Sequence, residues 1–400
     1  MVRQREAEGR LASAAWLALP DLQRIFAALD GAQARTRAVG GAVRDTLMAH
    51  DRTDTDIDLA TELLPTDVIE RAEAAGIAAY PTGIAHGTVT LRAGNVVAEV
   101  TTLREDVDTD GRHAVVRLGT DWRRDAQRRD FTLNALYAGS DGRLFDPLGG
   151  LDDCLDGRIR FIGDPDQRIA EDRLRVYRFF RFSASHGHQH FDPAGLEACE
   201  RASGTLTSLS AERVGTEITR MLGLARVART LSEMARIGVI QLAARKIEQL
   251  EAYEKLAQFA RSSGRFALLL SGEDVEAVQA RWRLSNEVIA DAEATLKAAG
   301  LVNMGALNEA AYRYGKYVED AVAVAAALAG RDAEEVAENR LRLRALVVPK
   351  FPISGADLLR KGMAPGKAVG LELARLERVW IDSGFALDRE TLLDEISVSR

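Results

Sequence analysis

Hydrophobic and polar positions follow two different periods along this chain, and the change falls near residue 150. Before it, short runs with alternating polarity and β-branched residues, such as residues 87–91 and 96–100, are interspersed with helical segments. After it, strand signals nearly vanish, and the spacing predicts successive helices. Breaks between these helices are expected near Gly187, Gly204, Gly264 and Gly300. The pattern predicts an α/β domain followed by an elongated all-α part.

The apolar content is sufficient for several domains, since 46% of the 400 residues are hydrophobic. The longest apolar run, residues 321–329, is too short to cross a bilayer and is interpreted as a core helix. The polar N-terminal sequence MVRQREAEGR predicts no signal peptide. Cys154 and Cys199 lack metal-ligand or redox spacing, which favours a reducing compartment and no structural zinc. We therefore expect a cytoplasmic protein with no membrane partner.

The sequence GGAVRDTLMAHDRTDTDID, which begins at Gly40, carries the most specific chemistry. Residues 36–39 would form a short strand, after which Gly40 and Gly41 permit close approach of a phosphate. Helical spacing over residues 42–50 would point the first backbone amides of a helix toward an anion. Arg44 would add a permanent charge and a planar fork of donors. This pattern predicts a triphosphate-binding turn.

Two carboxylates follow on an alternating stretch, residues 55–61. In a strand, Asp56 and Asp58 share one face while Ile57 and Leu59 share the other. Hard oxygen ligands on a rigid strand suit Mg²⁺, which bridges to substrate phosphates. A solvated polar loop is the alternative for these residues alone. The glycine turn and the carboxylates together favour a nucleotidyl-transfer site, with Asp56 and Asp58 as catalytic metal ligands.

The net charge of −7 argues against a nucleic-acid partner, but its distribution does not. Residues 158–181 hold seven arginines against four acidic residues, residues 213–246 hold seven basic residues against two acidic ones, and residues 340–361 hold six against one. These three stretches suggest a footprint for a long polyanion. Ordinary solvated helix faces remain the alternative for each stretch.

Residues 104–122 are polar and rich in glycine and aspartate, which predicts a mobile loop between ordered elements. The segment RRDFTLNA follows at residues 128–135. Its arginines and Asp130 would contact a triphosphate and ribose hydroxyls, although a structural salt-bridge cluster would have the same composition.

A long helix is expected over residues 168–186, in which Glu171 and Asp172 precede Arg175. Spacings of three would place Asp172, Arg175 and Arg178 together on its surface. Asp172 offers only acceptors and Arg175 only donors, so a base that satisfies both presents an amino group beside a ring-nitrogen acceptor. Cytosine and adenine do so, whereas uracil and guanine do not. This pair would select CTP and ATP, unless it is an ordinary intrahelical ion pair.

Together these segments resemble the class II tRNA nucleotidyltransferase and bacterial poly(A) polymerase family. The matching motifs are GGAVRD with DID (40–58), GIAHGT (83–88), RRDFTLNAL (128–136), DPLGGLDD (146–153), EDRLRVYRFFRF (171–182) and LSAERVGTE (209–217). They occur in the family's order over residues 35–220, which is more specific than any single motif. Cys154 stands where a leucine is usual, and residues 225–345 match nothing in particular.

The resemblance implies four parts: a nucleotidyltransferase-fold catalytic head (1–147), a nucleotide-selecting helical neck (148–222), a helical body (223–335) and a tRNA-binding helical tail (336–400). It implies that Asp56 and Asp58 are the metal ligands and that Asp172 with Arg175 is the base-selecting pair. The full nucleotide-binding set that we expect is Gly40, Gly41, Arg44, Arg129, Asp130, Asn134, Glu171, Asp172, Arg175, Arg178 and Arg181.

Within this family, the implied activity is template-independent addition of CMP, CMP and AMP to tRNA, with CTP and ATP as substrates and Mg²⁺ as cofactor. The segment 104–122 resembles a flexible loop associated with adding the terminal A, which favours the complete reaction. Poly(A) synthesis and partial addition are the alternatives within the family, and a non-catalytic RNA-binding protein is the alternative outside it.

Three histidines, His186, His188 and His190, raise the further possibility of a phosphohydrolase. They lack the separated His and His-Asp pairs that such a metal site needs, so a polar loop is expected for them. The oligomeric state does not follow from the sequence.

Overall fold

The computed structural model describes residues 2–50, 56–109 and 114–396. The chain forms two compact units. Unit 1 extends to Glu217 and includes Glu233–Gln241, while unit 2 contains Ile218–Ser232 and continues from Leu242. The four-part division expected from the sequence stays a prediction.

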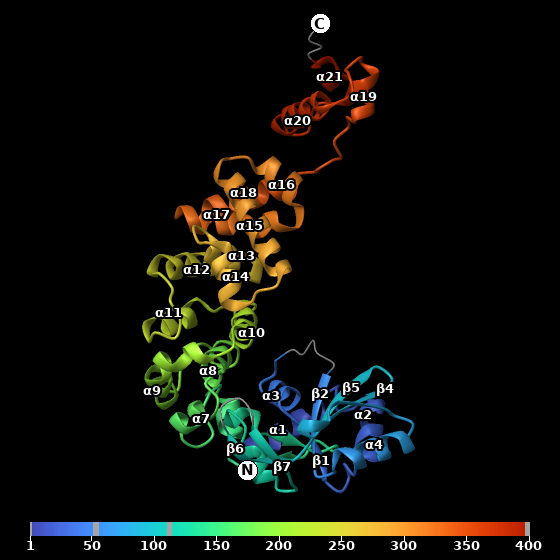
Figure 1. Ribbon diagram of the computed structural model, residues 1–400, viewed down its shortest axis with the longest axis vertical. Helices are drawn as coiled ribbons and strands as arrows, with labels where there is room; N and C mark the ends of the chain where they lie inside the picture. Colours follow the sequence, from blue (N-terminus) through green and yellow to red (C-terminus); the bar gives the residue numbers. More distant parts are fainter. Residues whose placement is uncertain (1, 51–55, 110–113, 397–400) are drawn as a thin grey trace. The chain divides into compact units, whose positions relative to one another are not determined.

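Unit 1 contains a mixed seven-stranded sheet in the order β3-β4-β5-β2-β1-β8-β9 (Figure 1). Strands β2 and β5 run parallel, and the other neighbouring strands run antiparallel. The strands are β1 (Thr36–Val39), β2 (Asp56–Thr61), β3 (Ala78–Gly83), β4 (Thr88–Ala93), β5 (Val96–Thr102), β8 (Tyr137–Ala138) and β9 (Leu144–Phe145). The strands predicted over residues 36–39, 55–61, 87–91 and 96–100 are thus present, except that Thr55 lies outside the described residues.

Helices accompany this sheet from the N-terminus onward. They are α1 (Val2–Ala12), α2 (Pro20–Ala28), α3 (Gly41–Leu47), α4 (Pro65–Ala74) and α5 (Trp122–Gln127). Helices α2 and α4 pack against β4 and β5, and α3 packs against β1 and β2. The helix predicted to follow the glycine turn is therefore α3, and it lies beside the two central strands.

Residues 104–122 differ from the prediction of a loop, because they form a second, two-stranded sheet of β6 (Arg104–Thr109) and β7 (Ala114–Leu118). The hairpin register runs from Arg104 opposite Leu118 to Thr109 opposite Ala114, with an irregularity between Asp106 and Asp108. Backbone pairing thus forms strands in a segment whose polar composition predicted a loop. Residues 110–113, between β6 and β7 in the sequence, lie outside the described residues.

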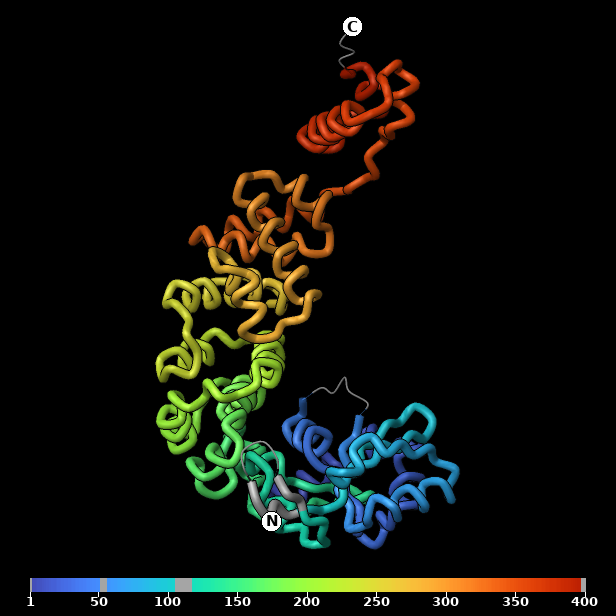
Figure 2. Tube along the Cα trace, viewed as in Figure 1, coloured from blue at the N-terminus to red at the C-terminus, as the bar shows by residue number. Residues whose placement is uncertain are grey.

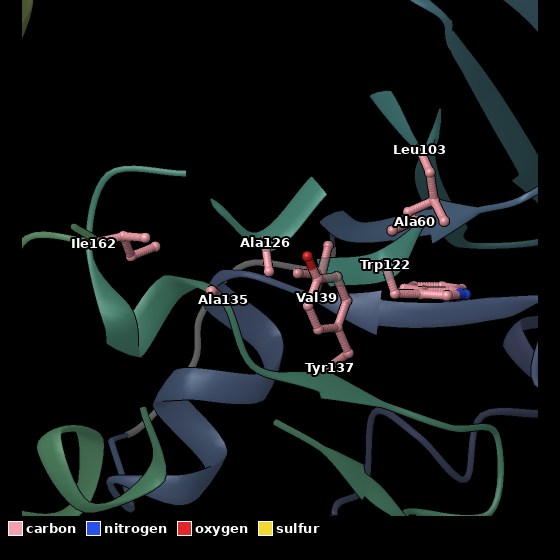
Figure 3. Packing of buried hydrophobic residues seen from close by; sticks show 8 residues of the cluster. All are labelled: Val39, Ala60, Leu103, Trp122, Ala126, Ala135, Tyr137 and Ile162. Carbon is pink, nitrogen blue, oxygen red and sulfur yellow. The ribbon is translucent and has the colours of Figure 1, made fainter. Parts of the chain in front are cut away.

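A compact apolar cluster joins the centre of the sheet to α5 (Figure 3). It contains Val39, Ala60, Leu103, Trp122, Ala126, Ala135, Tyr137 and Ile162. The rings of Trp122 and Tyr137 meet edge to face, with centroids 5.3 Å apart, a favoured aromatic geometry. This packing fixes the segment around residue 130 against the strands that carry the glycine turn and the carboxylates.

After residue 150, helix follows helix, as predicted (Figures 1 and 2). In unit 1 they are α6 (Leu151–Leu155), α7 (Pro165–Glu171), α8 (Arg175–Ser185) and α9 (Pro193–Ala202). Helices α10 (Ala211–Leu222) and α11 (Ala228–Arg236) each include residues of both units. The helices that lie in unit 2 alone are α12 (Ala244–Leu256), α13 (Ser262–Leu270), α14 (Val275–Trp282), α15 (Asn286–Asn303), α16 (Leu307–Tyr314), α17 (Val318–Ala329), α18 (Ala333–Ala345), α19 (Gly355–Arg360), α20 (Lys367–Asp382) and α21 (Arg389–Asp394).

One of the four expected helix breaks, at Gly300, is wrong, whereas the break expected near Gly264 is present at residues 257–261, between α12 and α13. Gly264 lies in the first turn of α13, where a Cβ atom would come within 2.4 Å of the Tyr253 hydroxyl, so the glycine permits close packing instead of ending a helix. Gly300 lies inside α15. The breaks at Gly187 and Gly204 are confirmed, since Gly187 follows α8 and Gly204 lies in a short 3₁₀ segment.

The apolar run 321–329 forms most of α17, and its residues 321–327 are buried, which confirms its interpretation as a core helix. Among the described residues, none of the helices combines the length and the apolar character that a bilayer crossing requires. At the C-terminal end, Trp380, Leu376 and Leu358 centre a separate apolar cluster that also includes Tyr312 of α16.

Candidate active site

The two predicted metal carboxylates lie on one face of β2. Asp56 and Asp58 are exposed, whereas Ile57 and Leu59 between and after them are buried. This alternation follows from the pleat of the strand, in which every second side chain points to the same side. The arrangement is the one that the DID sequence predicted.

The glycine turn lies directly against these carboxylates. Gly40 has φ +73°, a conformation that side chains other than glycine rarely adopt. A Cβ atom on Gly40 would come within 3.2 Å of Asp58 Oδ2. Gly41 begins α3 immediately afterwards. The turn is therefore shaped by both its backbone conformation and the space that Asp58 needs.

A third carboxylate, which the sequence reasoning missed, belongs to the same face. Glu99 on β5 is the register partner of Asp58 in the parallel pairing, and it is exposed. In register, residues on neighbouring strands carry their side chains on the same face. The only signal in the sequence was a single acid within the apolar run VVAEV.

Hard oxygen donors are the ligands that Mg²⁺ prefers. Asp56, Asp58 and Glu99 supply them on one exposed face, and the absence of a side chain at Gly40 keeps the approach to Asp58 open. These residues fit a divalent metal bound together with a phosphate.

Four of the predicted nucleotide contacts form one hydrogen-bonded chain. Arg44 Nη1 donates to Asn134 Oδ1 at 2.9 Å, and Asn134 Nδ2 donates to Asp130 Oδ1 at 3.0 Å. Arg178 Nε donates to the other oxygen, Asp130 Oδ2, at 2.7 Å. Burial disfavours the charged Asp130 carboxylate, but Arg178 and these donors hold its pKa below the ordinary value. The chain links α3, the segment after α5 and α8.

Glu217 on α10 extends this chain. Its Oε2 accepts from Arg181 Nε at 2.6 Å, and its Oε1 lies 3.8 Å from Arg178 Nη1. Only 3% of Glu217 is exposed, so it is a buried countercharge for two of the predicted nucleotide-contacting arginines. Glu217 ends the motif LSAERVGTE, whose spacing alone did not indicate a role for it.

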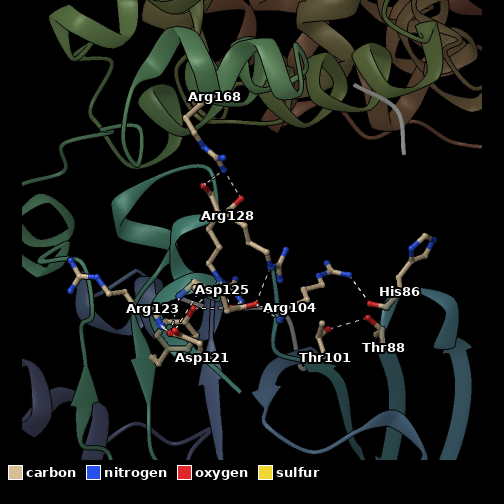
Figure 4. Close-up of polar contacts among 12 residues, drawn as sticks. His86, Thr88, Thr101, Arg104, Asp121, Arg123, Asp125, Arg128 and Arg168 are labelled. Atoms are coloured by element: carbon tan, nitrogen blue, oxygen red, sulfur yellow. Dashed lines mark hydrogen bonds and ion pairs between the residues drawn. The ribbon is translucent and has the colours of Figure 1, made fainter. Parts of the chain in front are cut away.

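Asp125 is a second buried carboxylate with several hydrogen-bonding partners, as Figure 4 shows. It pairs with Arg128 Nε at 2.9 Å and with Arg129 Nη2 at 3.1 Å, and Tyr137 donates to it at 2.9 Å. Burial opposes its charge, yet Arg129 and Arg128 hold the pKa of Asp125 below its usual range. Arg129, a predicted nucleotide contact, thus has a structural partner within its own segment.

The helix expected over residues 168–186 is wrong, because the chain breaks at Asp172. Helix α7 ends at Glu171, Asp172 adopts an extended conformation, and α8 begins at Arg175. Asp172 Oδ1 accepts from the backbone N–H of Leu174 at 3.1 Å. A side-chain acceptor just before a helix satisfies an amide that has no partner within the helix, which explains the break.

The break separates the predicted base-selecting pair. Asp172 Oδ2 accepts from Arg213 Nη2 at 2.7 Å. Arg175 Nη1 donates to Glu171 Oε2 and to the Arg168 carbonyl, both at 2.7 Å. Arg168 in turn donates to the carbonyl of Arg129 at 2.7 Å. Both members of the pair are therefore engaged by other charged or polar groups, and they are not neighbours on one continuous helix.

Of the three histidines, His186 departs from the polar loop that was expected. It is buried, and its Nε2 lies 3.1 Å from Asp45 Oδ1 of α3. His188 and His190 are exposed after the end of α8, as expected.

A glycine turn at a strand end, in-register carboxylates on β2 and β5, and arginines clustered nearby define a nucleotidyltransferase. Residues 36–160 match the family described as the poly(A) polymerase head domain. The chain is 33% identical to the mitochondrial CCA tRNA nucleotidyltransferase 1 of Danio rerio over 391 residues, which covers 92% of this chain and 88% of that protein. The chain belongs to the CCA tRNA nucleotidyltransferase family.

Bacterial relatives agree with this assignment. The chain is 30% identical to the CCA-adding enzyme of Limosilactobacillus fermentum, over 89% of this chain and 90% of that enzyme. The crystal structure of the Bacillus stearothermophilus CCA-adding enzyme in complex with CTP has a TM-score of 0.75 and 27% identity, covering 94% of this chain and 96% of that one. The fold class predicted from the sequence, a nucleotidyltransferase head followed by helices, is confirmed.

Proposed function

We propose that this nucleotidyltransferase completes the 3′ end of tRNA by adding CMP, CMP and AMP from CTP and ATP, with release of pyrophosphate. The exposed pair Asp56 and Asp58 beside the Gly40 turn, in a chain of this family, carries the proposal. In each step the tRNA 3′-hydroxyl oxygen loses its proton to solvent and forms a bond to the α-phosphorus, and the bond from this phosphorus to the pyrophosphate oxygen breaks. The structure of the Bacillus stearothermophilus enzyme in complex with CTP supports CTP as a substrate of this chain.

The proposed metal ion is Mg²⁺, held by Asp56 and Asp58 with Glu99 as a third carboxylate. When bound, it supplies positive charge that stabilises the attacking and leaving oxygens. Arg44 is held by Asn134 and Asp45 near the start of α3, where the helix amides also favour an anion, so we assign it to the triphosphate. Asp130, at the centre of the hydrogen-bonded chain, is assigned to the ribose.

We assign base selection to Asp172 and Arg175 and further nucleotide contacts to Gly41, Arg129, Glu171, Arg178 and Arg181. A cytosine or adenine edge would bind beside the present partners, because Asp172 accepts from Leu174 and Arg213 and a carboxylate has about four acceptor sites, while a guanidinium has five donors.

We also propose that the protein acts in the cytoplasm. Its cysteines, Cys154 and Cys199, are both buried free thiols, which is typical of a reducing compartment.

The decisive experiment supplies the purified protein with tRNA that lacks CCA, CA or only A, together with single nucleotides, and sizes the products. Complete addition predicts CMP on the first substrate, AMP on the last, and arrest after the terminal A. Long A tails would instead identify a poly(A) polymerase, failure on one of the substrates would identify a partial enzyme, and no product with any substrate would overturn the proposal.

Asp56→Ala tests the carboxylate assignment. We expect incorporation of both nucleotides to fall by more than about 100-fold, since even outer partners of a metal site cost that much. Glu70→Ala, an exposed acid on α4, is the matched control and should leave incorporation unchanged. Retained turnover in Asp56→Ala would refute the metal assignment.

A further inference from the structure

Asp45, His50 and His186 form a compact cluster in unit 1 that shares no residue with the carboxylates of β2. One ligand atom from each lies within 4.8 Å of the others. The two imidazole rings are stacked, with centroids 5.1 Å apart and an angle of 29° between their planes. His186 Nε2 lies 3.1 Å from Asp45 Oδ1. Residues far apart in the sequence are thus brought together by the packing of α3 and the end of α8.

Each of the three residues lies in or shortly after a helix. Asp45 lies within α3, and the N–H of His50 donates to the carbonyl of Asp45 at 2.8 Å in the turn that follows this helix. His186 ends α8, where its N–H donates to the carbonyl of Phe182 at 2.8 Å. Backbone order at these positions lowers the ordering cost of binding an ion.

The chemistry of His186 suits a metal ligand. Its Nδ1 lies 2.6 Å from Ser185 Oγ, which can accept the ring proton and leave the lone pair on Nε2 toward Asp45 and His50. An imidazole whose other nitrogen is held by a hydrogen bond is the usual arrangement of a histidine at a protein metal site.

We propose that Asp45, His50 and His186 form a binding site for a divalent transition ion of the Zn²⁺ class. Two imidazoles and one carboxylate favour Zn²⁺, Co²⁺ or Ni²⁺ over Mg²⁺, which prefers oxygen ligands only. Three protein ligands leave a coordination position for water, as in open zinc sites. The site is distinct from the oxygen site on β2 and does not depend on the proposed reaction.

One contact limits the affinity of this site and connects it to the nucleotide. Arg44 Nε donates to Asp45 Oδ1 at 2.8 Å, and this positive charge opposes a cation. An ion that takes Asp45 Oδ1 would therefore compete with Arg44, the residue assigned to the triphosphate. Occupation of the site would bind α3 to the end of α8 and loosen Arg44.

Cobalt titration of the full chain, without a histidine tag and stripped of metal, tests the proposal. Millimolar Mg²⁺ is kept present to occupy the oxygen site. We expect one Co²⁺ per chain with the intense visible absorption of a low-coordinate nitrogen and oxygen site, and competition by Zn²⁺. Absence of this spectrum in the parent protein would overturn the proposal.

His50→Gln is the main variant, because His50 is less buried than His186 and its replacement is less disruptive. It should weaken Co²⁺ binding by more than about tenfold, whereas His188→Gln, at an exposed histidine near the same helix end, should leave it unchanged. His186→Gln should also weaken it, and an unchanged thermal unfolding curve in EDTA establishes that each variant is folded. Unaltered Co²⁺ binding in folded His50→Gln would contradict the assignment.

Discussion

At the scale of single residues, Asp125 combines burial with three side-chain partners and a backbone N–H, that of Arg104. It is 1% exposed and pairs with Arg128, Arg129 and Tyr137. Replacement by asparagine keeps the shape and removes the charge, which leaves Arg129 without its buried countercharge. Such losses cost about 3–5 kcal/mol. We expect Asp125→Asn to lower the free energy of unfolding by that amount, measured by urea denaturation.

Asp121→Asn is the control for this prediction. Asp121 accepts from the N–H groups of Arg123 and Arg124 at the start of α5, and asparagine caps a helix about as well as aspartate. We expect a change below about 0.5 kcal/mol. Equal effects of the two substitutions would contradict the role given to Asp125.

The same carboxylate predicts a pH dependence. Burial opposes its charge, but Arg129 and Arg128 prevail and hold the folded-state pKa of Asp125 below the unfolded value of about 3.9. A depressed pKa contributes stability that is complete above the unfolded pKa and is lost as the pH falls below it. The difference in melting temperature between the parent and Asp125→Asn should therefore be constant from pH 8 to about pH 5 and shrink below about pH 4. A difference that persists unchanged to pH 3 would contradict this origin.

At the scale of elements, the break between α7 and α8 puts Asp172 in contact with both Leu174 and Arg213. Two roles are therefore possible for Asp172, in base selection and in the helix junction, and two substitutions separate them. If Asp172 reads the base, Asp172→Ala should relax rejection of UTP by more than about tenfold, since an unmet polar requirement no longer penalises the wrong base. Arg213→Gln should preserve that rejection. Competition between CTP and UTP in single-nucleotide addition measures both.

If Arg213→Gln relaxes the rejection of UTP as much as Asp172→Ala does, the helix junction determines base selection and Asp172 acts only by maintaining this junction. Unchanged discrimination in Asp172→Ala would remove Asp172 from base selection.

The β6–β7 hairpin occupies the segment that resembles the loop associated with adding the terminal A. We expect replacement of residues 107–115 by a short glycine-serine turn to spare CMP addition and to reduce AMP addition by more than about tenfold. The reason is that the site must rearrange to accept adenine after cytosine. Addition to tRNA lacking CCA and to tRNA lacking only A measures the two activities. Equal loss of both would show a general structural defect.

The sequence predicted most elements because period and composition agree there, as in β1, β2 and the apolar helix α17. It could not predict the break at Asp172, since apolar and charged positions continue through residues 171–182 with helical spacing. The break depends on a capping bond to Leu174 and on Arg213, which is distant in sequence. Glu99 and Glu217 were missed for the same reason, because strand register and helix packing bring them to the site.

At the scale of the whole molecule, charge distribution is more informative than net charge. The basic stretch 340–361 includes Arg342 and Lys350, both exposed in unit 2. We expect Arg342→Gln with Lys350→Gln to weaken tRNA binding. The slope of the logarithm of the binding constant against the logarithm of the salt concentration should become shallower by roughly 0.7–0.9 for each phosphate that these side chains neutralise. Binding of CTP alone should not change. Filter binding of tRNA over a range of KCl concentrations measures the slope.

Lys297→Gln provides the control, because Lys297 is an exposed lysine of α15 outside the basic stretches. An identical slope in the double variant and the parent would exclude these two residues from the RNA-binding surface.

The chain passes between the two units three times, since Ile218–Ser232 and Glu233–Gln241 belong to different units. One proteolytic cut therefore cannot separate the two units cleanly, because a cut after Gln241 leaves residues 218–232 of unit 2 on the fragment that holds unit 1. A gene fragment that stops after residue 222, the expected end of the neck, would lack Val239, whose carbonyl accepts from the Tyr177 hydroxyl at 3.3 Å. Separate expression of the nucleotide-binding part would require residues 233–241 to be supplied as well, for example through a shortened linker in place of residues 218–232.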